Sequence, residues 1–399
     1  MNRKTGIRIL AIVIAVVLAL SLLLLPLTAF AALAINILRR GTAQPFPSAA
    51  PARQTGRQEA AQISIETETD RERIIYTMQE ILFAILFLVI GFLLLIKGAD
   101  FFVDGSSAVA KLLRVPPIII GLTVVAMGTS LPELAVSVTA SMSGNNALAV
   151  SNVVGSNVFN LMVVCGLCAV FTPLAIQRDS LTKEFPFSIF CGVLLLALGY
   201  AGMAVGRLDG LVLLALFAVY MIIMVRTALK ARAGNAAMAA EEAAMEHDIR
   251  PLPLWECILF IVGGLVAIKF GGDFVVDGAT TVAAALGLSQ NLIGLTIVAV
   301  GTSLPELVTS IVAARKKELD MALGNVIGSN IFNILLILGV AAVISPVTFI
   351  FENMIDIVLL TGMSLLVWIF GWTRQRLSRA EGIVMLAIYA AYLVYICIR

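Results

Sequence analysis

The sequence is poor in charged residues, in histidine and in any regular arrangement of cysteines. Only 13% of its 399 residues are Asp, Glu, Lys or Arg, and 60% are hydrophobic, whereas a soluble domain has roughly 25% charged residues. The single histidine, His247, lies in a polar stretch, so a histidine-based metal site and a Ser-His-Asp triad are not expected. The five cysteines are an odd number spread over apolar segments, which does not indicate a disulfide framework.

The sequence also lacks the patterns of several other protein classes. The net charge is +2, which gives no basis for nucleic-acid binding. It has no P-loop, no pair of nucleophile and base, and no cofactor motif, so we expect neither an enzyme nor a bound cofactor. Many apolar runs approach the ~20 residues that span a bilayer. The composition therefore predicts an all-α polytopic membrane protein.

The N-terminal region carries one hydrophobic segment in addition to the main body. Residues 1–40 begin with basic residues and continue through an apolar run with small-x-small patterns at 29–34. This predicts either a signal peptide or an extra membrane anchor, and both remain open. Residues 41–77 are rich in Ala, Gln, Pro, Arg and Glu without a period, which predicts a disordered linker.

From Met78 onward the sequence predicts ten transmembrane helices. The apolar segments lie at 79–97, 117–141, 147–170, 186–206, 209–226, 253–272, 290–314, 321–344, 353–371 and 381–398. A polar stretch at 227–252 separates a first repeat, 78–226, from a second repeat, 253–399, with five segments in each. We expect 227–252 to be a partly helical loop.

The two halves repeat each other at an offset of 173 residues, the separation of Glu133 from Glu306. Residues 98–166 align without a gap with 271–339, and 33 of the 69 positions are identical. Shared apolar composition explains matches among Val, Ile and Leu. It does not explain the return of GTSLPEL and GSN in register, so the halves are predicted to share one fold.

Because each half has an odd number of segments, equivalent segments must cross the membrane in opposite directions, as in the inverted repeats of many transporters. If segment 79–97 runs from outside to inside, the outside connections carry Arg207 and little other basic charge. The inside connections then carry Lys111, Arg114, Arg178, Lys183, Arg226, Lys230, Arg232, Arg250, Arg315, Lys316, Lys317, Arg374, Arg376 and Arg379. The positive-inside rule therefore predicts a cell (inner or plasma) membrane protein with residue 78 and the C-terminus outside and loop 227–252 in the cytoplasm.

Each copy of GTSLPEL places a proline and a glutamate inside an apolar segment. A carboxylate at mid-membrane costs roughly 2.5–3.5 kcal/mol on insertion scales, so two such carboxylates indicate a function. Pro132 and Pro305 lack an N–H and interrupt helical hydrogen bonding. Non-helical backbone at membrane depth is tolerated only where protein buries it or it lines a cavity. We therefore expect a broken helix that offers oxygen atoms beside Glu133 and Glu306.

Polar side chains recur at helical spacing around each glutamate. Thr129 and Ser130 lie four and three residues before Glu133 and share its helix face. In the next segment the polar stripe consists of Asn152, Ser156 and Asn160. The second half repeats both patterns with Thr302, Ser303, Glu306, Asn325, Ser329 and Asn333. Any single hydroxyl here has the alternative role of binding a neighbouring helix. Inversion of the halves is expected to bring these side chains together near the bilayer centre. They would form an all-oxygen site, which suits hard cations such as Ca²⁺ and Na⁺.

On these motifs, residues 78–399 resemble the sodium/calcium exchanger family of the calcium:cation antiporter superfamily, in its prokaryotic form. The resemblance implies two inverted five-helix halves with broken second, third, seventh and eighth helices around a central ion site. It implies side-chain ligands for the transported ions at Glu133, Glu306, Asn160, Asn333, Thr129, Ser130, Thr302, Ser303, Ser156 and Ser329. It further implies backbone ligands at Ala126 and Ala299, and exchange of three Na⁺ for one Ca²⁺.

Several members of that family, including the potassium-dependent exchangers, have Asp where this chain has Asn333. Asn in both halves argues against potassium co-transport and gives the site a formal charge of −2, which one Ca²⁺ or two Na⁺ neutralise. We therefore predict a secondary-active antiporter of Na⁺ and Ca²⁺ that works by alternating access, in a lipid bilayer, with one chain sufficient for transport. The alternative is an H⁺/Ca²⁺ or other divalent-cation exchanger, because carboxylates also carry protons. A cation channel fits less well, since pores are often oligomeric rings and this chain contains its own paired site.

Overall fold

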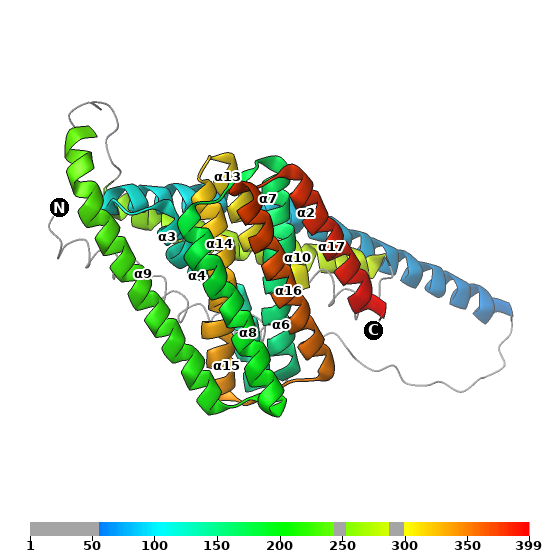
Figure 1. The fold of residues 1–399 in the computed structure, drawn as a ribbon. Coiled ribbons are helices and arrows are strands. Elements are labelled where there is room, and N and C mark those ends of the chain that lie inside the picture. The colour runs from blue at the N-terminus through cyan, green and yellow to red at the C-terminus, as the bar shows by residue number, and fades with distance from the viewer. Residues whose placement is uncertain (1–55, 145, 243–252, 287–298, 399) are drawn as a thin grey trace.

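The structure is a computed structural model that describes residues 56–144, 146–242, 253–286 and 299–398 (Figure 1). These residues are almost all helical, which confirms the predicted all-α membrane class. Among them, eight helices are long and apolar enough to cross a bilayer, and one bent pair of helices makes a ninth span. The predicted segment 290–314 lies only partly within the described residues, and 1–40 lies outside them.

The first half consists of five spans and two short strands. The spans are α2 (Gly56–Leu113); α3 (Pro117–Ile120), η1 (Gly121–Val125), α4 (Ala126–Thr129) and α5 (Leu131–Met142); α6 (Asn146–Phe159), η2 (Asn160–Val164) and α7 (Cys165–Phe171); η3 (Ser180–Glu184) and α8 (Phe185–Gly202); and α9 (Arg207–Glu242). The η segments are π-helical turns. The strands are β1 (Leu174–Ala175) and β2 (Ala204–Val205).

The second half follows the same order. Its described elements are α10 (Leu254–Ala285); α12 (Ala299–Gly301) and α13 (Leu304–Arg315); α14 (Leu319–Phe332), η5 (Asn333–Ile337) and α15 (Leu338–Ile344); β3 (Val347–Thr348); α16 (Phe351–Arg374); β4 (Arg376–Leu377); and α17 (Arg379–Ile398). Thus the π-helical turns η2 and η5 occupy equivalent places in the two halves.

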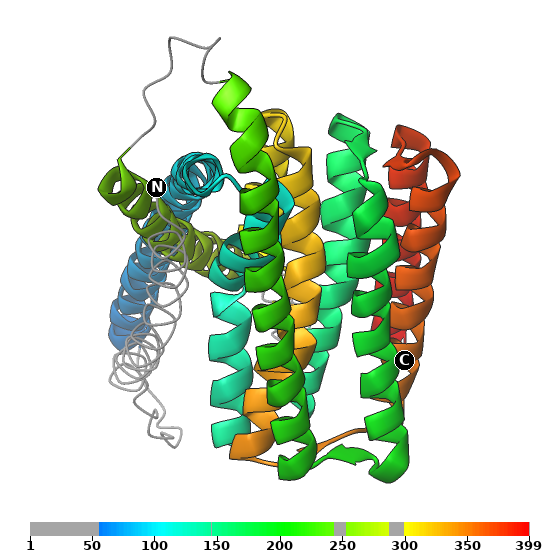
Figure 2. The ribbon, with the colours of Figure 1, turned by 60° about the vertical axis from the view of Figure 1, so that its left-hand side comes forward.

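The first helices of the two halves, α2 and α10, pack against each other on one side of an upright bundle (Figure 2). A Cβ atom added to Gly91 would lie 2.8 Å from the carbonyl oxygen of Gly271. One added to Gly105 would lie 2.9 Å from the carbonyl oxygen of Cys257. The partner's residue number falls as that of α2 rises, so the two helices are antiparallel. Equivalent helices therefore run in opposite directions, as an inverted repeat requires, and glycine permits their backbones to approach this closely.

The two halves are interlocked elsewhere in the molecule. Strand β1 pairs antiparallel with β4, and β2 pairs antiparallel with β3, so each ladder joins one half to the other. In addition, Gly166 of α7 approaches the carbonyl oxygen of Gly382 in α17. Gly210 of α9 approaches that of Gly339 in α15. The third span of each half thus packs against the last span of the other, and the repeats form one unit.

Two features differ from the predictions. Residues 56–77, predicted as part of a disordered linker over 41–77, are the first turns of α2; residues 41–55 lie outside the described residues. Ala, Gln, Glu and Arg favour helix, and continuity with a long helix removes the cost of nucleation. Helix α9 continues to Glu242, so residues 227–242 of the expected partly helical connection are helical. Finally, the third and eighth spans are continuous through η2 and η5 rather than broken, because a π-turn keeps the backbone hydrogen-bonded.

Candidate ion-binding site

Each GTSLPEL segment interrupts its helix at the serine. Ser130 has φ −83° and ψ 13° between α4 and α5, and the span bends there by 48°. Ser303 has φ −94° and ψ 8° before α13. The proline that follows lies in the first turn of the next helix, where its missing N–H costs no hydrogen bond. Glu133 and Glu306 also lie in those first turns, and the positive end of a helix stabilises a carboxylate.

The two carboxylates are bound by serines of the opposite half. Ser130 Oγ donates to Glu306 Oε1 at 2.9 Å, and Ser303 Oγ donates to Glu133 Oε1 at 2.9 Å. Ser156 Oγ lies 3.4 Å from the same Glu133 oxygen. All five side chains are buried, and both glutamates are fully buried. Inversion therefore brings the two motifs together as predicted, with each half contributing to the surroundings of the other's carboxylate.

The asparagines at the start of each polar stripe hold the broken helices in place. Asn152 Nδ2 donates to Ser137 Oγ at 2.9 Å and to the carbonyl oxygen of Glu133 at 3.1 Å. In the second half, Asn325 Nδ2 donates to Ser310 Oγ at 2.9 Å. Its Oδ1 accepts from Thr129 Oγ1 at 3.0 Å. The two serines are not among the predicted site residues, although their spacing of four residues from each glutamate is a signal that identifies them.

Several buried polar atoms around the glutamates have no hydrogen-bond partner among the described residues. They are Glu133 Oε2, Glu306 Oε2, Asn160 Oδ1 and Nδ2, Ser329 Oγ and Asn333 Oδ1. Roughly 90% or more of buried polar groups in proteins have a partner, so this concentration is unusual. Five of the six atoms are oxygens, which are the ligands that Na⁺ and Ca²⁺ prefer. The arrangement therefore fits a cation as the missing partner.

The charge of the site points the same way. The ion pairs among the described residues involve Lys97, Lys183, Lys269 and Lys316, and none of them includes Glu133 or Glu306. Two buried ionised carboxylates without a basic partner are strongly unfavourable unless a cation or a proton neutralises them. Within the same part of the chain, no cluster of three or more His, Cys, Asp or Glu side chains occurs. A cation held here would therefore depend on hydroxyl, amide and carbonyl oxygens as well as on the two carboxylates.

The remaining predicted ligands lie at the breaks and at the π-turns. Asn160 and Asn333 are the first residues of η2 and η5, and π-turns are frequent at functional sites. The carbonyl oxygen of Ala126 accepts from the Ser130 N–H at 3.1 Å. Ala299 begins α12, and Thr302 follows that helix directly. Ion binding by any of these residues stays a prediction.

Two further asparagines that the sequence analysis did not single out lie beside this set. Asn157 Nδ2 donates to the carbonyl oxygen of Asn330 at 3.1 Å, and Asn330 Nδ2 donates to that of Asn157 at 3.3 Å. Asn157 Oδ1 also accepts from Asn333 Nδ2 at 2.9 Å. Both asparagines belong to the GSN motifs, which recur at the repeat offset of 173 residues. This recurrence is the sequence signal that could have identified them as part of the site.

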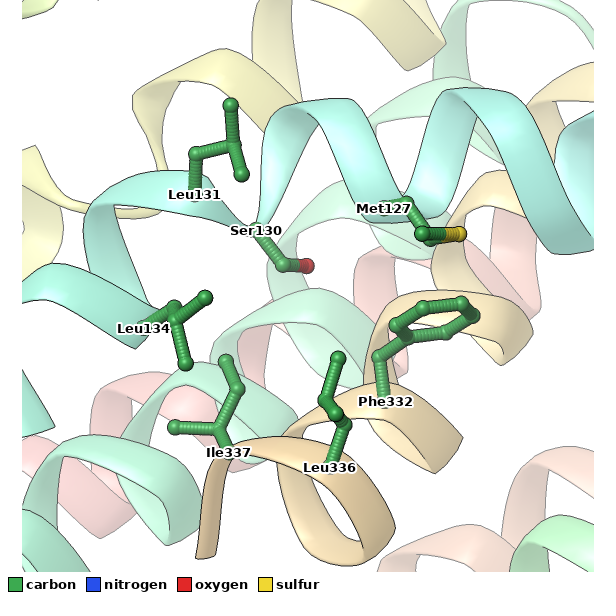
Figure 3. Close-up of a pocket in the computed structure, with 7 residues that line it drawn as sticks. All are labelled: Met127, Ser130, Leu131, Leu134, Phe332, Leu336 and Ile337. Carbon is green, nitrogen blue, oxygen red and sulfur yellow. The ribbon is translucent and has the colours of Figure 1, made fainter. Parts of the chain in front are cut away.

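A small pocket adjoins the site at the break of the second span (Figure 3). The α4–α5 side contributes Met127, Ser130, Leu131 and Leu134, and the α14–η5 side contributes Phe332, Leu336 and Ile337. Figure 3 shows the Ser130 hydroxyl directed into the space between Met127 and Phe332. The pocket is otherwise apolar, so the serine that binds Glu306 is its polar group.

Comparisons with known proteins agree with this architecture. The model of the family described as "Sodium/calcium exchanger protein" matches residues 83–226 and 256–398. The chain is 32% identical to the sodium/calcium exchanger MaX1 of Methanosarcina acetivorans over 341 residues, which cover 77% of this chain and 97% of that protein. It is 38% identical over 266 residues to the inner membrane protein YrbG of Escherichia coli, covering 66% of this chain and 81% of YrbG.

A solved structure has the same fold. The sodium-calcium exchanger NCX_Mj, soaked with 2.5 mM Na⁺ and 10 mM Sr²⁺, superposes with a TM-score of 0.67 and is 32% identical. The match covers 79% of this chain and 99% of the other. The same protein soaked without Na⁺ and Ca²⁺ also matches with a TM-score of 0.67.

Proposed function

Because the chain belongs to the sodium/calcium exchanger protein family, we propose that it is a secondary-active antiporter that exchanges Na⁺ for Ca²⁺ across a membrane. The observation that carries this proposal is the pair of buried glutamates, each bound through one oxygen by a serine of the opposite half. The other oxygen of each carboxylate has no partner among the described residues. Such a pair presents two negative charges and free oxygens to a cation, and no basic side chain of the described residues forms an ion pair with either carboxylate.

The site's formal charge explains why the two ions compete. Asn160 and Asn333 are neutral, so Glu133 and Glu306 alone give −2, which one Ca²⁺ or two Na⁺ neutralise. Both ions take oxygen ligands, and a single set of oxygens cannot complete the shells of both at once. Ca²⁺ therefore leaves when Na⁺ occupies the shared oxygens, and this mutual exclusion couples the two fluxes. The ligand set we propose is the one predicted from the sequence, centred on these four residues.

Inversion of the two halves supports alternating access. Equivalent elements reach the site from opposite directions, so a rearrangement that opens one side has a counterpart that opens the other. The pocket lined by Met127, Leu134, Phe332 and Ile337 reaches the Ser130 hydroxyl. Met127 precedes Ser130 in this span and Leu134 follows it, so the pocket extends along the broken span on both sides of Ser130.

Contacts between connections support the proposed sidedness. Strands β1 and β4 belong to connections predicted to lie inside, and they pair with each other. Strands β2 and β3 belong to connections predicted to lie outside, and they also pair. From the distribution of basic residues we propose that residue 78 and the C-terminus lie outside and that 227–252 lies in the cytoplasm. We propose the cell membrane as the location and a single chain as the transporting unit.

An exchanger that uses H⁺ instead of Na⁺ is the second candidate. The specific observation in its favour is that neither buried glutamate is in an ion pair within the described residues. Each carboxylate can then be neutralised by a proton as well as by Na⁺. Both candidates use the same two residues, so only the driving gradient separates them.

The deciding experiment is Ca²⁺ flux into proteoliposomes under one imposed gradient at a time. We expect radiolabelled Ca²⁺ to accumulate against an opposed Na⁺ gradient at equal pH on both sides. A pH gradient without Na⁺ is expected to drive no accumulation, and added K⁺ is expected to have no effect. Accumulation driven by the pH gradient alone would show that H⁺ and not Na⁺ is the coupling ion. Ca²⁺ flux that depends on neither gradient would contradict antiport.

A further inference from the structure

Asn157 and Asn330 form a reciprocal contact where the third spans of the two halves meet. Each Nδ2 donates to the other residue's backbone oxygen, at 3.1 Å and 3.3 Å. Both side chains are buried, with exposed fractions of 0% and 2%. The two residues are separated by the repeat offset, so this contact relates the halves symmetrically.

The same pair is asymmetric in its side-chain oxygens. Asn157 Oδ1 accepts from Asn333 Nδ2 at 2.9 Å. The equivalent oxygen, Asn330 Oδ1, has no partner among the described residues, and neither has the equivalent donor, Asn160 Nδ2. Of two hydrogen bonds that the repeat makes equivalent, one is formed and the other is open in this conformation.

The formed bond determines which end of the Asn333 amide faces the ion site. An asparagine amide has an oxygen that can ligate a cation and an NH₂ group that only donates. Because Asn157 holds Nδ2, the free end of Asn333 is Oδ1. A flip of the amide would break this bond and leave two buried polar groups unpaired, which is costly. Asn157 therefore fixes Asn333 in the orientation that a cation requires.

We propose, on the basis of the exchange function above, that Asn157 and Asn330 are positioning residues that hold Asn333 and Asn160 in turn. In the described conformation Asn157 orients Asn333. In the conformation open to the other side, inversion exchanges the roles of the halves. Asn330 Oδ1 then accepts from Asn160 Nδ2, and Asn333 is released. Asn157 and Asn330 thus act through the amides that they orient. The Asn333 oxygen has a fixed direction in one conformation, and the Asn160 oxygen has a fixed direction in the other.

Substitution of either residue should affect one face of the membrane more than the other. Asn157→Ala is expected to raise the Ca²⁺ concentration for half-maximal exchange about 10-fold on one face, since partners that orient metal ligands are typically worth 10–100-fold in affinity. Asn330→Ala is expected to have the same effect on the opposite face. Asn353→Ala is the matched control, because Asn353 is buried and bonds Ser151 of α6 at 3.3 Å but lies outside the proposed ligand set. Its effect should stay within about 2-fold on both faces.

A double-mutant cycle separates orientation from packing. A carboxylate presents an oxygen at either end, so Asn333→Asp removes the need for orientation. In that background Asn157→Ala should change the Ca²⁺ affinity by less than about 2-fold. If Asn157 only packs helices together, the roughly 10-fold loss should persist in both backgrounds. Equal losses in the two backgrounds, or equal effects of Asn157→Ala and Asn330→Ala on both faces, would overturn the proposal.

Binding of radiolabelled Ca²⁺ to the purified full chain in detergent keeps this test independent of the proposed function. It measures the cycle of Asn157 and Asn333 without any flux. If the unsubstituted chain binds Ca²⁺ but shows no Na⁺-coupled transport, the antiport proposal fails while the cycle can still be measured. If coupled transport is present and the cycle shows no coupling between the two residues, the positioning role fails instead.

Discussion

Substitution of Gly98 by alanine tests the antiparallel packing of α2 and α10 directly. A Cβ at Gly98 would lie 2.8 Å from the backbone nitrogen of Ile268 and 2.9 Å from the carbonyl oxygen of Gly264. These are backbone atoms, so the clash can be relieved only by moving one helix away from the other. Such overpacking costs about 1–3 kcal/mol, against about 1 kcal/mol gained because alanine favours helix over glycine. We therefore expect Gly98→Ala to destabilise the protein by up to about 2 kcal/mol net.

Gly263→Ala provides the matched control in the partner helix. Gly263 lies next to Gly264 in α10, but nothing lies within 4 Å of a Cβ added there. This substitution should keep only the helix-propensity gain of about 1 kcal/mol. Thermal unfolding of both variants in detergent should therefore shift the transition in opposite directions from that of the unsubstituted protein. If Gly98→Ala is as stable as Gly263→Ala, the two helices do not pack as described.

Three further predictions concern the ion site. Glu133→Gln or Glu306→Gln should abolish exchange, because each substitution removes half of the site's charge, while the protein still inserts and unfolds cooperatively. Normal flux by either variant would show that the substituted glutamate does not bind the transported ions. Ser303→Ala deletes the 2.9 Å hydrogen bond to Glu133 and should weaken Ca²⁺ binding by about 10- to 150-fold, since hydrogen bonds to charged groups are worth 1.5–3 kcal/mol. Ser364→Ala, which deletes a bond within α16, should leave Ca²⁺ binding unchanged. Asn333→Asp takes the formal charge from −2 to −3 and should tighten Ca²⁺ binding and make it more sensitive to pH; unchanged affinity and pH profile in a binding assay would argue against a ligand role for Asn333.

Much of the fold could be predicted because many residues are identical at equivalent positions of the two halves. The offset from Glu133 to Glu306 predicted the repeat, and the odd number of segments in each half predicted its inversion. The antiparallel contact of α2 with α10 agrees with that inversion. The clustering of both GTSLPEL motifs was also predictable, since a carboxylate in an apolar segment needs partners at membrane depth. In contrast, the glycines at 91, 98 and 105 are required because the backbone of α10 approaches them closely. No sequence pattern within one half reveals that contact.

The details of the site depend on contacts that cross the repeat. Asn157 lies within a predicted motif, yet its partners are Asn330 and Asn333 of the other half. A polar stripe with a spacing of four residues could not indicate these contacts. The π-turns at Asn160 and Asn333 likewise differ from regular helix by one residue in the hydrogen-bond ladder, a difference with little signature in sequence. Composition also misjudged 56–77, because a polar segment can be helical when it continues a long helix.

Competition between Na⁺ and Ca²⁺ for the purified protein tests most directly the claim that both ions use one site between Glu133 and Glu306. The measurement is equilibrium binding of radiolabelled Ca²⁺ while Na⁺ is raised at constant ionic strength. We expect one Ca²⁺ to bind per chain, to be displaced steeply by more than one Na⁺, and not to bind to Glu306→Gln. Ca²⁺ that stays bound at saturating Na⁺, or that binds Glu306→Gln as tightly as the unsubstituted chain, would contradict it.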